Sequence, residues 1–544
     1  MSILATVSKP CESGVVYTKP WMVEMVLDLA GYYPERHLAE MVALEPSAGD
    51  GAFLIAMVRR LVESCRRHNT PLIMAVKAIQ SFEIDPKAAA RATELVQSTL
   101  LELGIARKTA SELSSHWVQA ADFLEGVMRF PIADFVIGNP PYIRLEEIPA
   151  NKAMFYRNAF STMRGRADIY VAFYEAALHQ LRPGGVCAYI CSDRWMLNDY
   201  GSALRKFITT EGFSVRYVVE AHDVGAFESE VSAYPAVTVI AKEEQGPVII
   251  AKANSGVEKM ERSALVSDIR GARSGPFLKA AQFPNWFSGT EPWPCSSPEA
   301  LELLKHLEAT CHPLECSKTG TKIGIGVATG ADRVFISSQK PDIEQDRALP
   351  LALASDLVNG IVVWSGHYLA NPWNEDGLIN LAEYPRFETH LKPHAALLSE
   401  RHTAKKDRPQ NWHKTIDRVN LRLFRQPKLY IADIKDRLLP SLDEGKTYPQ
   451  HNLYWITSEA WDLKVLGALL MSEVGQFFIR CYGVRMRGGF LRFQAQYLRR
   501  IRVPDPTTFS PTLIKKLRFA FEEQNFDLAN EGALEAYQLD RLPE

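Results

Sequence analysis

The chain has 544 residues, of which 47% are hydrophobic and 23% charged, and its 62 Lys and Arg residues nearly balance 64 Asp and Glu residues for a net charge of −2. This composition excludes a disordered chain, a fibre and a protein that holds nucleic acid through bulk charge, and the length predicts two or three domains. No apolar run reaches the roughly 18 residues of a membrane span, residues 1–10 do not form a secretory signal, and the eight cysteines include no CxxC pair. We therefore expect a cytoplasmic protein that does not bind a membrane.

Up to residue 241 the chain alternates short apolar runs with longer segments of helical periodicity. Alternation of this kind, with strands apolar on both faces, is typical of a mostly parallel sheet covered by helices on both sides. We predict a doubly wound α/β domain over residues 1–245. The expected strands are 41–45, 79–84, 132–137, 185–191, 215–220 and 236–241, and the expected helices are 52–67, 87–103 and 170–181.

The pattern changes after residue 245. Residues 246–297 mix Gly, Pro, Ser and charged residues without clear periodicity, and we expect a linker there. Ser297 followed by Pro298 is a favourable helix start. The remaining residues, 298–544, have no second strand–helix alternation and predict a separate domain of mixed α/β content.

Positive charge is concentrated in that second domain. Residues 401–440 contain eleven Lys or Arg and four Asp or Glu, and residues 480–504 contain seven Arg and no acid. Four aromatic side chains are interspersed among those arginines. Basic residues combined with aromatics are typical of a nucleic-acid surface, although a solvated basic face is the alternative.

A glycine-rich loop lies where the first strand turns into the first helix, in the sequence LEPSAGDGAFL of residues 44–54. Gly49 and Gly51 allow a ligand to approach the backbone, and the helix start offers free N–H groups. Glu45 suits a ligand with an ammonium group. The loop is neither a GxGxxG fingerprint nor a phosphate loop, and by itself a purely structural turn is an equally good interpretation.

Acidic residues end the next two strands. Glu83 and Asp85 lie at the end of the second strand, and Asp122 precedes Phe123 after a third strand that we expect ahead of 132–137. A carboxylate at the carboxyl edge of a parallel sheet can accept hydrogen bonds from ribose hydroxyls or from an exocyclic amine of adenine. Acids also cap helices, so each acid by itself is a weak indication of a binding site. Their recurrence at successive strand ends indicates a nucleoside site.

The sequence Asn139-Pro140-Pro141-Tyr142 follows the fourth strand directly. Two consecutive prolines hold the turn extended and remove two backbone donors. The Asn139 amide oxygen and the Pro140 carbonyl remain as acceptors, and Tyr142 adds a stacking face. Accepting both N–H groups of a planar amine localises its lone pair and directs it at an electrophile. We expect Asn139, Pro140 and Tyr142 to be catalytic.

These motifs, with GVVYTKP at residues 14–20 ahead of them, resemble the ordered motifs of DNA amino-methyltransferases that use S-adenosyl-L-methionine. Their order resembles the gamma class, the TaqI-like and Eco57I-like N6-adenine DNA methyltransferases. The resemblance covers residues 14–241 and continues more weakly in 320–335, 426–430 and 488–504. It implies a Rossmann-like domain that binds this cofactor over 1–245, a DNA-recognition domain over 298–544, and double-stranded DNA as the substrate.

The resemblance also implies roles for particular residues. Two of these residues also have a purely structural interpretation: Phe173 could be part of an apolar helix face, and Phe227 could be a core aromatic. Implied contacts are Thr18, Glu45, Ala48 and Gly49 with the methionine end of the cofactor, Glu83 with its ribose, Asp122, Phe123 and Phe173 with its adenine, Tyr142 and Phe227 with a flipped-out target base, and Lys428, Arg485, Arg487 and Arg492 with DNA.

Other chemistries fit the sequence less well. Methylation at C5 of cytosine needs a cysteine nucleophile, and Cys11 and Cys295, which follow prolines, lie away from the strand ends. We expect no metal, since His390 and His394 lack the glutamate of an HExxH site. An RNA adenine or protein-glutamine methyltransferase and a non-catalytic DNA-binding specificity subunit remain alternatives. The resemblance further implies a cognate restriction endonuclease as a partner, which an orphan methyltransferase would lack.

Overall fold

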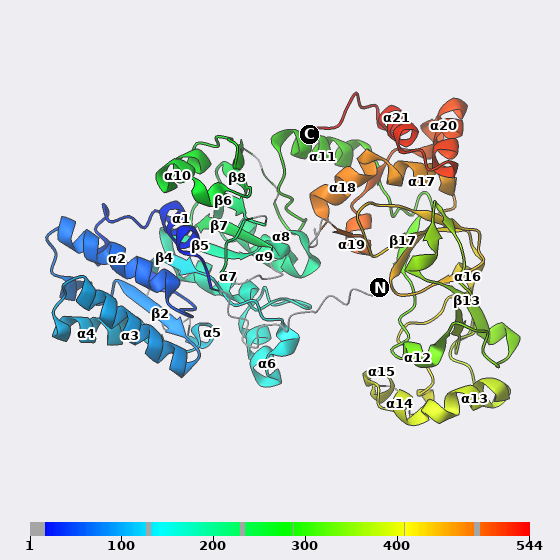
Figure 1. Cartoon of the computed structure of the whole chain (residues 1–544), viewed down its shortest axis with the longest axis horizontal. Helices are drawn as coiled ribbons and strands as arrows, with labels where there is room; N and C mark the ends of the chain where they lie inside the picture. The colour runs from blue at the N-terminus through cyan, green and yellow to red at the C-terminus, as the bar shows by residue number, and fades with distance from the viewer. Residues whose placement is uncertain are drawn as a thin grey trace. The chain divides into compact units, whose positions relative to one another are not determined.

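A mixed sheet forms the centre of the first of two units, Met1–Pro298 and Glu299–Glu544, into which the computed structural model divides the chain (Figure 1). The structure describes residues 17–126, 132–222, 224–228, 234–284, 286, 288–406, 409–483 and 490–543. In this part of the chain, nine strands of the first unit pair in the order β3-β2-β1-β4-β5-β7-β6-β8-β9. They are β1 (Ala43–Glu45), β2 (Ile79–Glu83), β3 (Val118–Ala120), β4 (Ala133–Gly138), β5 (Leu181–Ser192), β6 (Ser214–Glu220), β7 (Pro235–Ala241), β8 (Val248–Ala253) and β9 (Leu278–Phe283).

The first five strands of that order run parallel, and β7 lies antiparallel between β5 and β6. All residues of β4 and β7 are buried, because helices cover both faces of the sheet. The helices are α1 (Pro20–Ala30), α2 (Ala52–Arg67), α3 (Pro86–Glu102), α4 (Arg107–Trp117), α5 (Phe123–Gly126), α6 (Ala150–Ala159), α7 (Tyr170–Gln180), α8 (Arg194–Leu197), α9 (Ser202–Thr210) and α10 (Arg262–Arg270). The predicted doubly wound α/β fold is confirmed.

Strand β5 illustrates how the sequence produces two covered faces. Side chains of a strand alternate between the faces of its sheet. Ala188 and Ile190 belong to the core cluster that also contains the apolar residues of α1 and α2. Between them, Tyr189 points to the other face, where its ring lies 5.1 Å from that of Tyr174 on α7.

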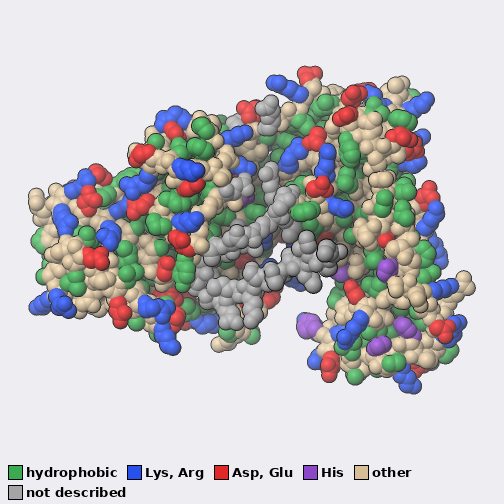
Figure 2. All heavy atoms as spheres, viewed as in Figure 1, with side chains coloured by type: hydrophobic (Ala, Val, Ile, Leu, Met, Phe, Trp, Pro, Cys, Tyr) green, Lys and Arg blue, Asp and Glu red, His purple; other side chains and the backbone are tan. Residues whose placement is uncertain are grey.

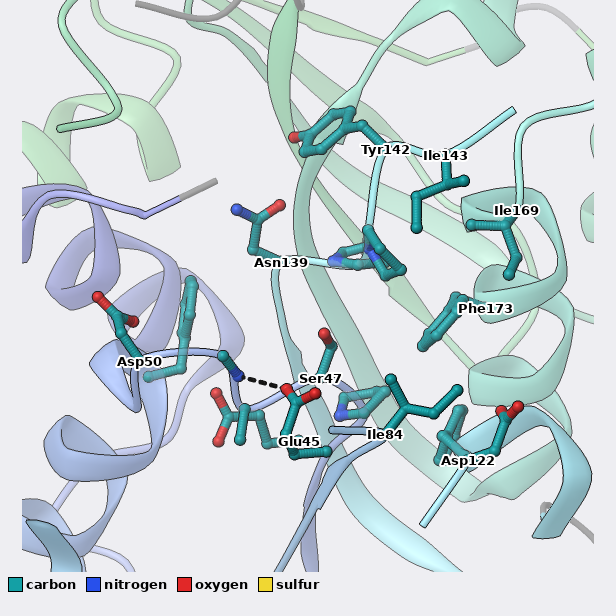
Figure 3. Close-up of a pocket in the computed structure, with 18 of the residues that line it drawn as sticks. Glu45, Ser47, Asp50, Ile84, Asp122, Asn139, Tyr142, Ile143, Ile169 and Phe173 are labelled. Atoms are coloured by element: carbon teal, nitrogen blue, oxygen red, sulfur yellow. Dashed lines mark hydrogen bonds between the residues drawn. The ribbon is translucent and has the colours of Figure 1, made fainter. Parts of the chain in front are cut away.

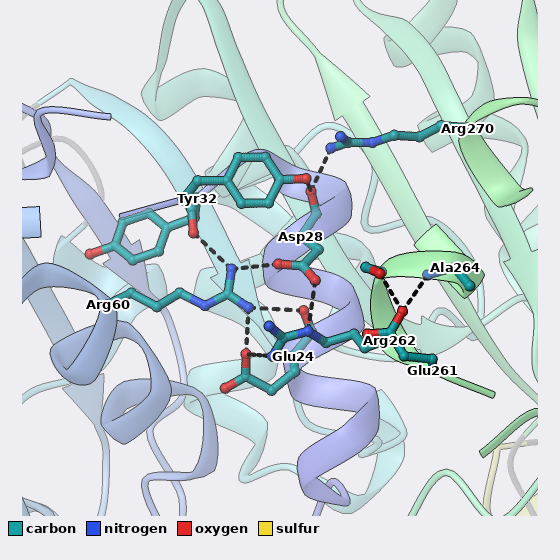
Figure 4. Close-up of polar contacts among 10 residues, drawn as sticks. Glu24, Asp28, Tyr32, Arg60, Glu261, Arg262, Ala264 and Arg270 are labelled. Carbon is teal, nitrogen blue, oxygen red and sulfur yellow. Dashed lines mark hydrogen bonds and ion pairs between the residues drawn. The ribbon is translucent and has the colours of Figure 1, made fainter. Parts of the chain in front are cut away.

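Residues 246–297 differ from the linker expected of them. They supply β8, which pairs parallel with β6, and β9, which pairs antiparallel with β8. Helix α10 from the same segment binds α1: Arg262 pairs with Glu24 at 2.8 Å and with Asp28 at 3.2 Å (Figure 4). Buried Arg60 of α2 pairs with the same two acids. The segment therefore belongs to the first unit. Its apolar strand β8 was not predicted because turn-forming residues flank it in the sequence.

The second unit has the mixed α/β content that the sequence predicts. Its two larger sheets have the orders β11-β21-β17-β19-β15-β14 and β12-β16-β13-β20. Its strands are β10 (His312–Pro313), β11 (Lys322–Ile325), β12 (Ile336–Ser337), β13 (Ala348–Ala352), β14 (Leu357–Val358), β15 (Ile361–Val362), β16 (Tyr368–Ala370), β17 (Lys428–Ala432), β18 (Ile434–Lys435), β19 (Ser441–Asp443), β20 (Tyr448–Pro449), β21 (Leu453–Thr457), β22 (Leu491–Arg492) and β23 (Arg502–Val503). Its helices are α11 (Pro298–Thr310), α12 (Asp332–Phe335), α13 (Pro385–Leu391), α14 (Ala395–Ser399), α15 (His402–Lys405), α16 (Leu421–Arg425), α17 (Leu463–Met471), α18 (Glu473–Tyr482), α19 (Ala495–Leu498), α20 (Pro511–Glu522) and α21 (Phe526–Tyr537).

Glycines in residues 320–330 have a packing role. A Cβ atom at Gly324 would overlap the ring of Trp455, and one at Gly326 would overlap the Gln450 carbonyl. The Trp455 indole N–H also donates to the Ile325 carbonyl at 3.0 Å. Close approach of β11 to β21 therefore accounts for Gly324, and close approach to the Gln450 carbonyl accounts for Gly326.

Charge on the visible face is mixed in sign, with Lys and Arg side chains interspersed among Asp and Glu over both units (Figure 2). Within the described residues, no single helix is long and apolar enough to cross a membrane. Helices α17 and α18, bent by 61° at their junction, pass that test together by length and composition only, and most of their residues are buried in the second unit.

Candidate active site

A pocket with an internal volume of about 150 Å³ lies at the carboxyl ends of β1, β2, β3 and β4. Asn139 and Tyr142 lie toward one end, and Ile84 and Asp122 toward the other (Figure 3). The residues singled out in the sequence that line this pocket are Thr18, Glu45, Ala48, Gly49, Glu83, Asp122, Phe123, Asn139, Pro140, Tyr142 and Phe173.

The glycine-rich loop is held against the end of β2. Ala48 N–H donates to the Phe82 carbonyl at 2.8 Å, and Gly49 N–H donates to Oε2 of Glu83 at 2.9 Å. Oε1 of Glu83 accepts from Asp85 N–H, also at 2.9 Å. Gly49 has a φ of 54°, in the left-handed region that favours glycine. Glu83 thus fixes the loop while its carboxylate borders the pocket.

Glu45, at the end of β1, is 1% exposed and accepts a hydrogen bond from the Ser81 hydroxyl at 2.9 Å. Burial raises the pKa of this carboxyl well above its usual value; the Ser81 hydrogen bond opposes the rise, and the charges of Asp50 and Glu83 add to it. A cationic ligand would stabilise the ionised form of Glu45.

Four acids line the pocket, and no Lys, Arg or His is among the described residues that line it. The pocket therefore attracts positive charge. Among the described residues no group of three or more His, Cys, Asp or Glu side chains is placed to hold a metal ion; that the protein needs no metal stays a prediction. The four acids are Glu45, Asp50, Glu83 and Asp122.

The opposite end of the pocket combines Asp122 with aromatic rings. Phe123 and Phe173 stack with centroids 5.8 Å apart and an interplanar angle of 24°. Asp122 accepts hydrogen bonds from Tyr156 and Lys152 of α6. Neither residue was indicated by sequence patterns, because their pairing with Asp122 depends on the path of the chain between β4 and α7.

Asn139 is held by the N-terminal segment. Its side-chain N–H donates to Oγ1 of Thr18 at 3.2 Å. Thr18 reaches this position because residues 17–19 pair with residues 226–228: Lys19 N–H donates to the Ala226 carbonyl, and Thr18 forms an isolated bridge with Phe227. Two motifs about 200 residues apart in sequence therefore meet beside the Pro-Pro turn.

An aromatic group surrounds Tyr142. The ring of Phe227 lies edge-on to it, with centroids 6.4 Å apart. The ring of Tyr170 lies 6.3 Å away on another side. Phe227 itself is outside the pocket lining. Tyr170 was missed in the sequence, although it stands three residues before Phe173 and shares its face of α7.

The predicted DNA contacts of the second unit differ in where the structure places them. The prediction that Lys428 contacts DNA is wrong: the side chain is fully buried on β17 and donates to Asp443 at 2.7 Å and to the Gln426 carbonyl at 2.8 Å. Arg492 is 42% exposed and pairs with Asp433 at 3.2 Å. Arg485 and Arg487 lie outside the described residues.

Comparison with known proteins identifies the family. Residues 80–227 match the Eco57I restriction-modification methylase model, and residues 388–503 match the TaqI-like C-terminal specificity domain. The chain is 40% identical to the Type II methyltransferase M.XhoI of Xanthomonas vasicola over 98% of both chains. It is 38% identical to M.BstVI of Geobacillus stearothermophilus, covering 97% of this chain and 96% of that one.

A solved structure supports the same fold across both units. The Type IIL restriction-modification enzyme MmeI in complex with DNA aligns with a TM-score of 0.61 at 12% identity, over 97% of this chain and 75% of that one. The sequence relatives and the matched family models define the class, a restriction-modification methyltransferase. The chain belongs to the Type II methyltransferase family, with an Eco57I-like methylase region and a TaqI-like C-terminal specificity domain, which confirms the resemblance seen in the sequence.

Proposed function

We propose that the chain transfers the methyl group of S-adenosyl-L-methionine to N6 of an adenine that is flipped out of double-stranded DNA at a specific sequence. The observation that carries this proposal is the meeting of the Asn139 and Pro140 acceptors with the acidic strand ends in one pocket. A site for an amine to be methylated therefore adjoins a site for a cationic nucleoside. Family membership supports methyl transfer.

The pocket suits the proposed cofactor in charge and shape. When bound, this cofactor supplies an electrophilic methyl group on a sulfonium, and it carries a second positive charge on its amino-acid ammonium. Glu45 and Thr18 would hold the methionine end beside the Ala48–Gly49 backbone, and Glu83 would accept from the ribose hydroxyls. Asp122, Phe123 and Phe173 would hold the adenine, where the structure combines a carboxylate with stacked rings.

The residues at the other end suit an aromatic amine. In the structure the side-chain nitrogen of Asn139 donates to Oγ1 of Thr18, and this sets the direction of the amide oxygen. That oxygen and the Pro140 carbonyl would accept the two N6 hydrogens, and Tyr142, backed by Phe227, would stack on the base. The N6 lone pair forms the new bond to the methyl carbon as the carbon–sulfur bond breaks, and N6 then loses one proton to solvent.

The proposed substrate is DNA because the specificity-domain match covers residues 388–503 and the MmeI structure is a complex with DNA. Arg485, Arg487 and Arg492 remain proposed DNA contacts of the second unit. The Type II relatives support a cytoplasmic role as the modification partner of a cognate restriction endonuclease.

The first experiment is incubation with methyl-labelled S-adenosyl-L-methionine and unmethylated bacterial genomic DNA, followed by mass spectrometry of the nucleosides. We expect N6-methyladenine at one short sequence. Label on cytosine, or only on RNA or protein amides, would overturn the proposal.

The matching variant is Asn139→Ala, which removes one preorganised acceptor. We expect it to lower the single-turnover rate by about 10²–10³-fold while binding of S-adenosylhomocysteine and DNA is retained. Asn254→Ala, in the same unit but outside the pocket lining, is the control and should transfer methyl groups at the native rate. An unchanged rate in Asn139→Ala would remove this side chain from the reaction.

A further inference from the structure

Helix α6 contributes two donors to a single carboxylate at the pocket's far end. Tyr156 O–H donates to Oδ2 of Asp122 at 2.6 Å, and Lys152 Nζ donates to the same oxygen at 2.9 Å. The two residues stand four apart and therefore share one face of α6. Oδ1 of Asp122 accepts from Leu124 N–H at 3.0 Å.

This arrangement limits how Asp122 can meet a ligand. A carboxylate has about two acceptor positions on each oxygen. Both positions on Oδ2 are used by α6, and one on Oδ1 is used by the backbone, so one position on Oδ1 remains. All three described partners are donors, so the group acts as a pure acceptor. Tyr156, 2% exposed, lines the pocket itself and prevents Asp122 from turning Oδ2 toward it.

The ionisation of the partners is consistent with this geometry. Burial, together with the neighbouring Asp122 charge, raises the pKa of Tyr156, which therefore remains a hydroxyl donor. For Lys152, burial favours the neutral form, but the hydrogen bond to Asp122 and its charge outweigh burial and raise the pKa. The ammonium is further held by Glu125 of α5 at 3.4 Å.

We propose that Lys152 and Tyr156 are positioning residues that orient Asp122 so that it selects a 6-aminopurine over a 6-oxopurine on the cofactor, an inference that rests on the proposed function. An exocyclic amine would donate to the remaining position on Oδ1. A 6-oxo group in its place would put a carbonyl oxygen against a carboxylate that cannot turn away, and both acceptors would be left without a shared proton.

The test measures binding of S-adenosylhomocysteine and S-inosylhomocysteine to the full chain by isothermal titration calorimetry, without DNA. We expect the native protein to bind the adenosyl compound about 10–100-fold more tightly, as suits one hydrogen bond to a charged group. Tyr156→Phe and Lys152→Met should reduce that ratio by about 3–10-fold. Lys152→Arg, which keeps a cationic donor, should restore most of it.

The controls separate positioning from general damage. Tyr33→Phe removes a phenol hydroxyl that donates to the Asp28 carbonyl elsewhere in the unit, and should leave the ratio unchanged. In an Asp122→Asn background, Tyr156→Phe should cause little further change, because the two residues act as one unit. Equal weakening of both ligands in Tyr156→Phe and Lys152→Met would overturn the inference and leave a structural role. Failure of the native protein to bind either ligand would instead overturn the cofactor proposal.

Discussion

Two acids that line the pocket of the first unit and two acids of the second unit are stabilised by different kinds of partner. In the pocket of the first unit, Glu45 accepts from a hydroxyl and Glu83 from two backbone N–H groups, all of them neutral donors. In the second unit, Asp443 faces Lys428 and Asp433 faces Arg492. Neutral donors fix a carboxylate and leave its charge for a ligand, whereas a cationic partner uses that charge to hold the fold. A buried acid for which the protein supplies no cation therefore keeps its charge for a ligand, whereas Asp122, at the far end of the pocket, shares its charge with Lys152.

The largest effect expected from this comparison is at Lys428. Lys428→Met would leave Asp443, 2% exposed, without its cation, and we expect a loss of about 3–5 kcal/mol in the free energy of unfolding. Urea denaturation measures it. Asp443→Asn in the same chain should recover part of the loss, since it removes the unpaired charge.

Lys446→Met, which removes an exposed pair with Glu444, is the matched control for Lys428→Met and should leave the urea midpoint unchanged. If both variants were equally stable, the Lys428 pair would have no special structural role, and its charge would be open to another function.

The converse change is Glu45→Gln in the first unit. Gln can still accept from Ser81 and carries no buried charge, so we expect stability to be kept or slightly raised. Binding of S-adenosylhomocysteine should weaken by about 10–100-fold, because its ammonium loses an ionised partner. Calorimetry measures the binding, and Glu94→Gln, at an exposed acid of α3, is the control. Loss of stability with intact binding would reverse the comparison.

The sequence could predict the pocket because the carboxyl ends of neighbouring parallel strands meet at one edge. Glu45 and Glu83 end such strands and Asn139 follows one, so their convergence needs only the strand order. Lys428 was not predictable in this way: its partner Asp443 lies on β19, across a pairing that local pattern does not encode. The pairing of Tyr156 with Asp122 likewise depends on the path of the chain between β4 and α7.

The prediction of a linker at residues 246–297 was wrong for a related reason. Its strand β8 has a clear apolar run, but Gly246 and Pro247 precede it and a charged helix follows. Whether such a strand joins a sheet depends on an open edge elsewhere, here on β6. Composition alone therefore favoured a linker.

His222, in the first unit but outside the pocket, is a partner of acids whose charge depends on pH. Its Nε2 lies 2.6 Å from Asp193 and its Nδ1 3.0 Å from Glu220. Burial by itself would lower the pKa of His222, but the hydrogen bonds and charges of the two acids outweigh it and raise the pKa to about 10.

Because this folded-state pKa lies above the unfolded value near 6.5, the charged histidine stabilises the fold fully below about pH 6.5, and the stabilisation is lost as the pH rises through about 10. We expect the free energy of unfolding to fall by up to about 3–4 kcal/mol between pH 7 and pH 10. Urea denaturation at each pH measures it. His222→Gln should flatten that dependence. A native profile as flat as the variant's would mean that the two acids do not hold a charged histidine.

The smallest effect is expected at Arg492, whose ion pair with Asp433 is partly exposed. Its guanidinium donates to both oxygens of Asp433 at 3.2–3.4 Å, and 42% of the side chain remains exposed. Such a pair contributes less than about 1 kcal/mol to stability. Arg492→Gln should therefore barely change unfolding, but should reduce the slope of log DNA affinity against log salt by up to about 0.9. Asp433→Asn, which releases the guanidinium, should strengthen DNA binding at low salt. Unchanged binding in both variants would exclude the β18–β22 ribbon from the proposed DNA surface and assign Arg492, like Lys428, to the fold alone.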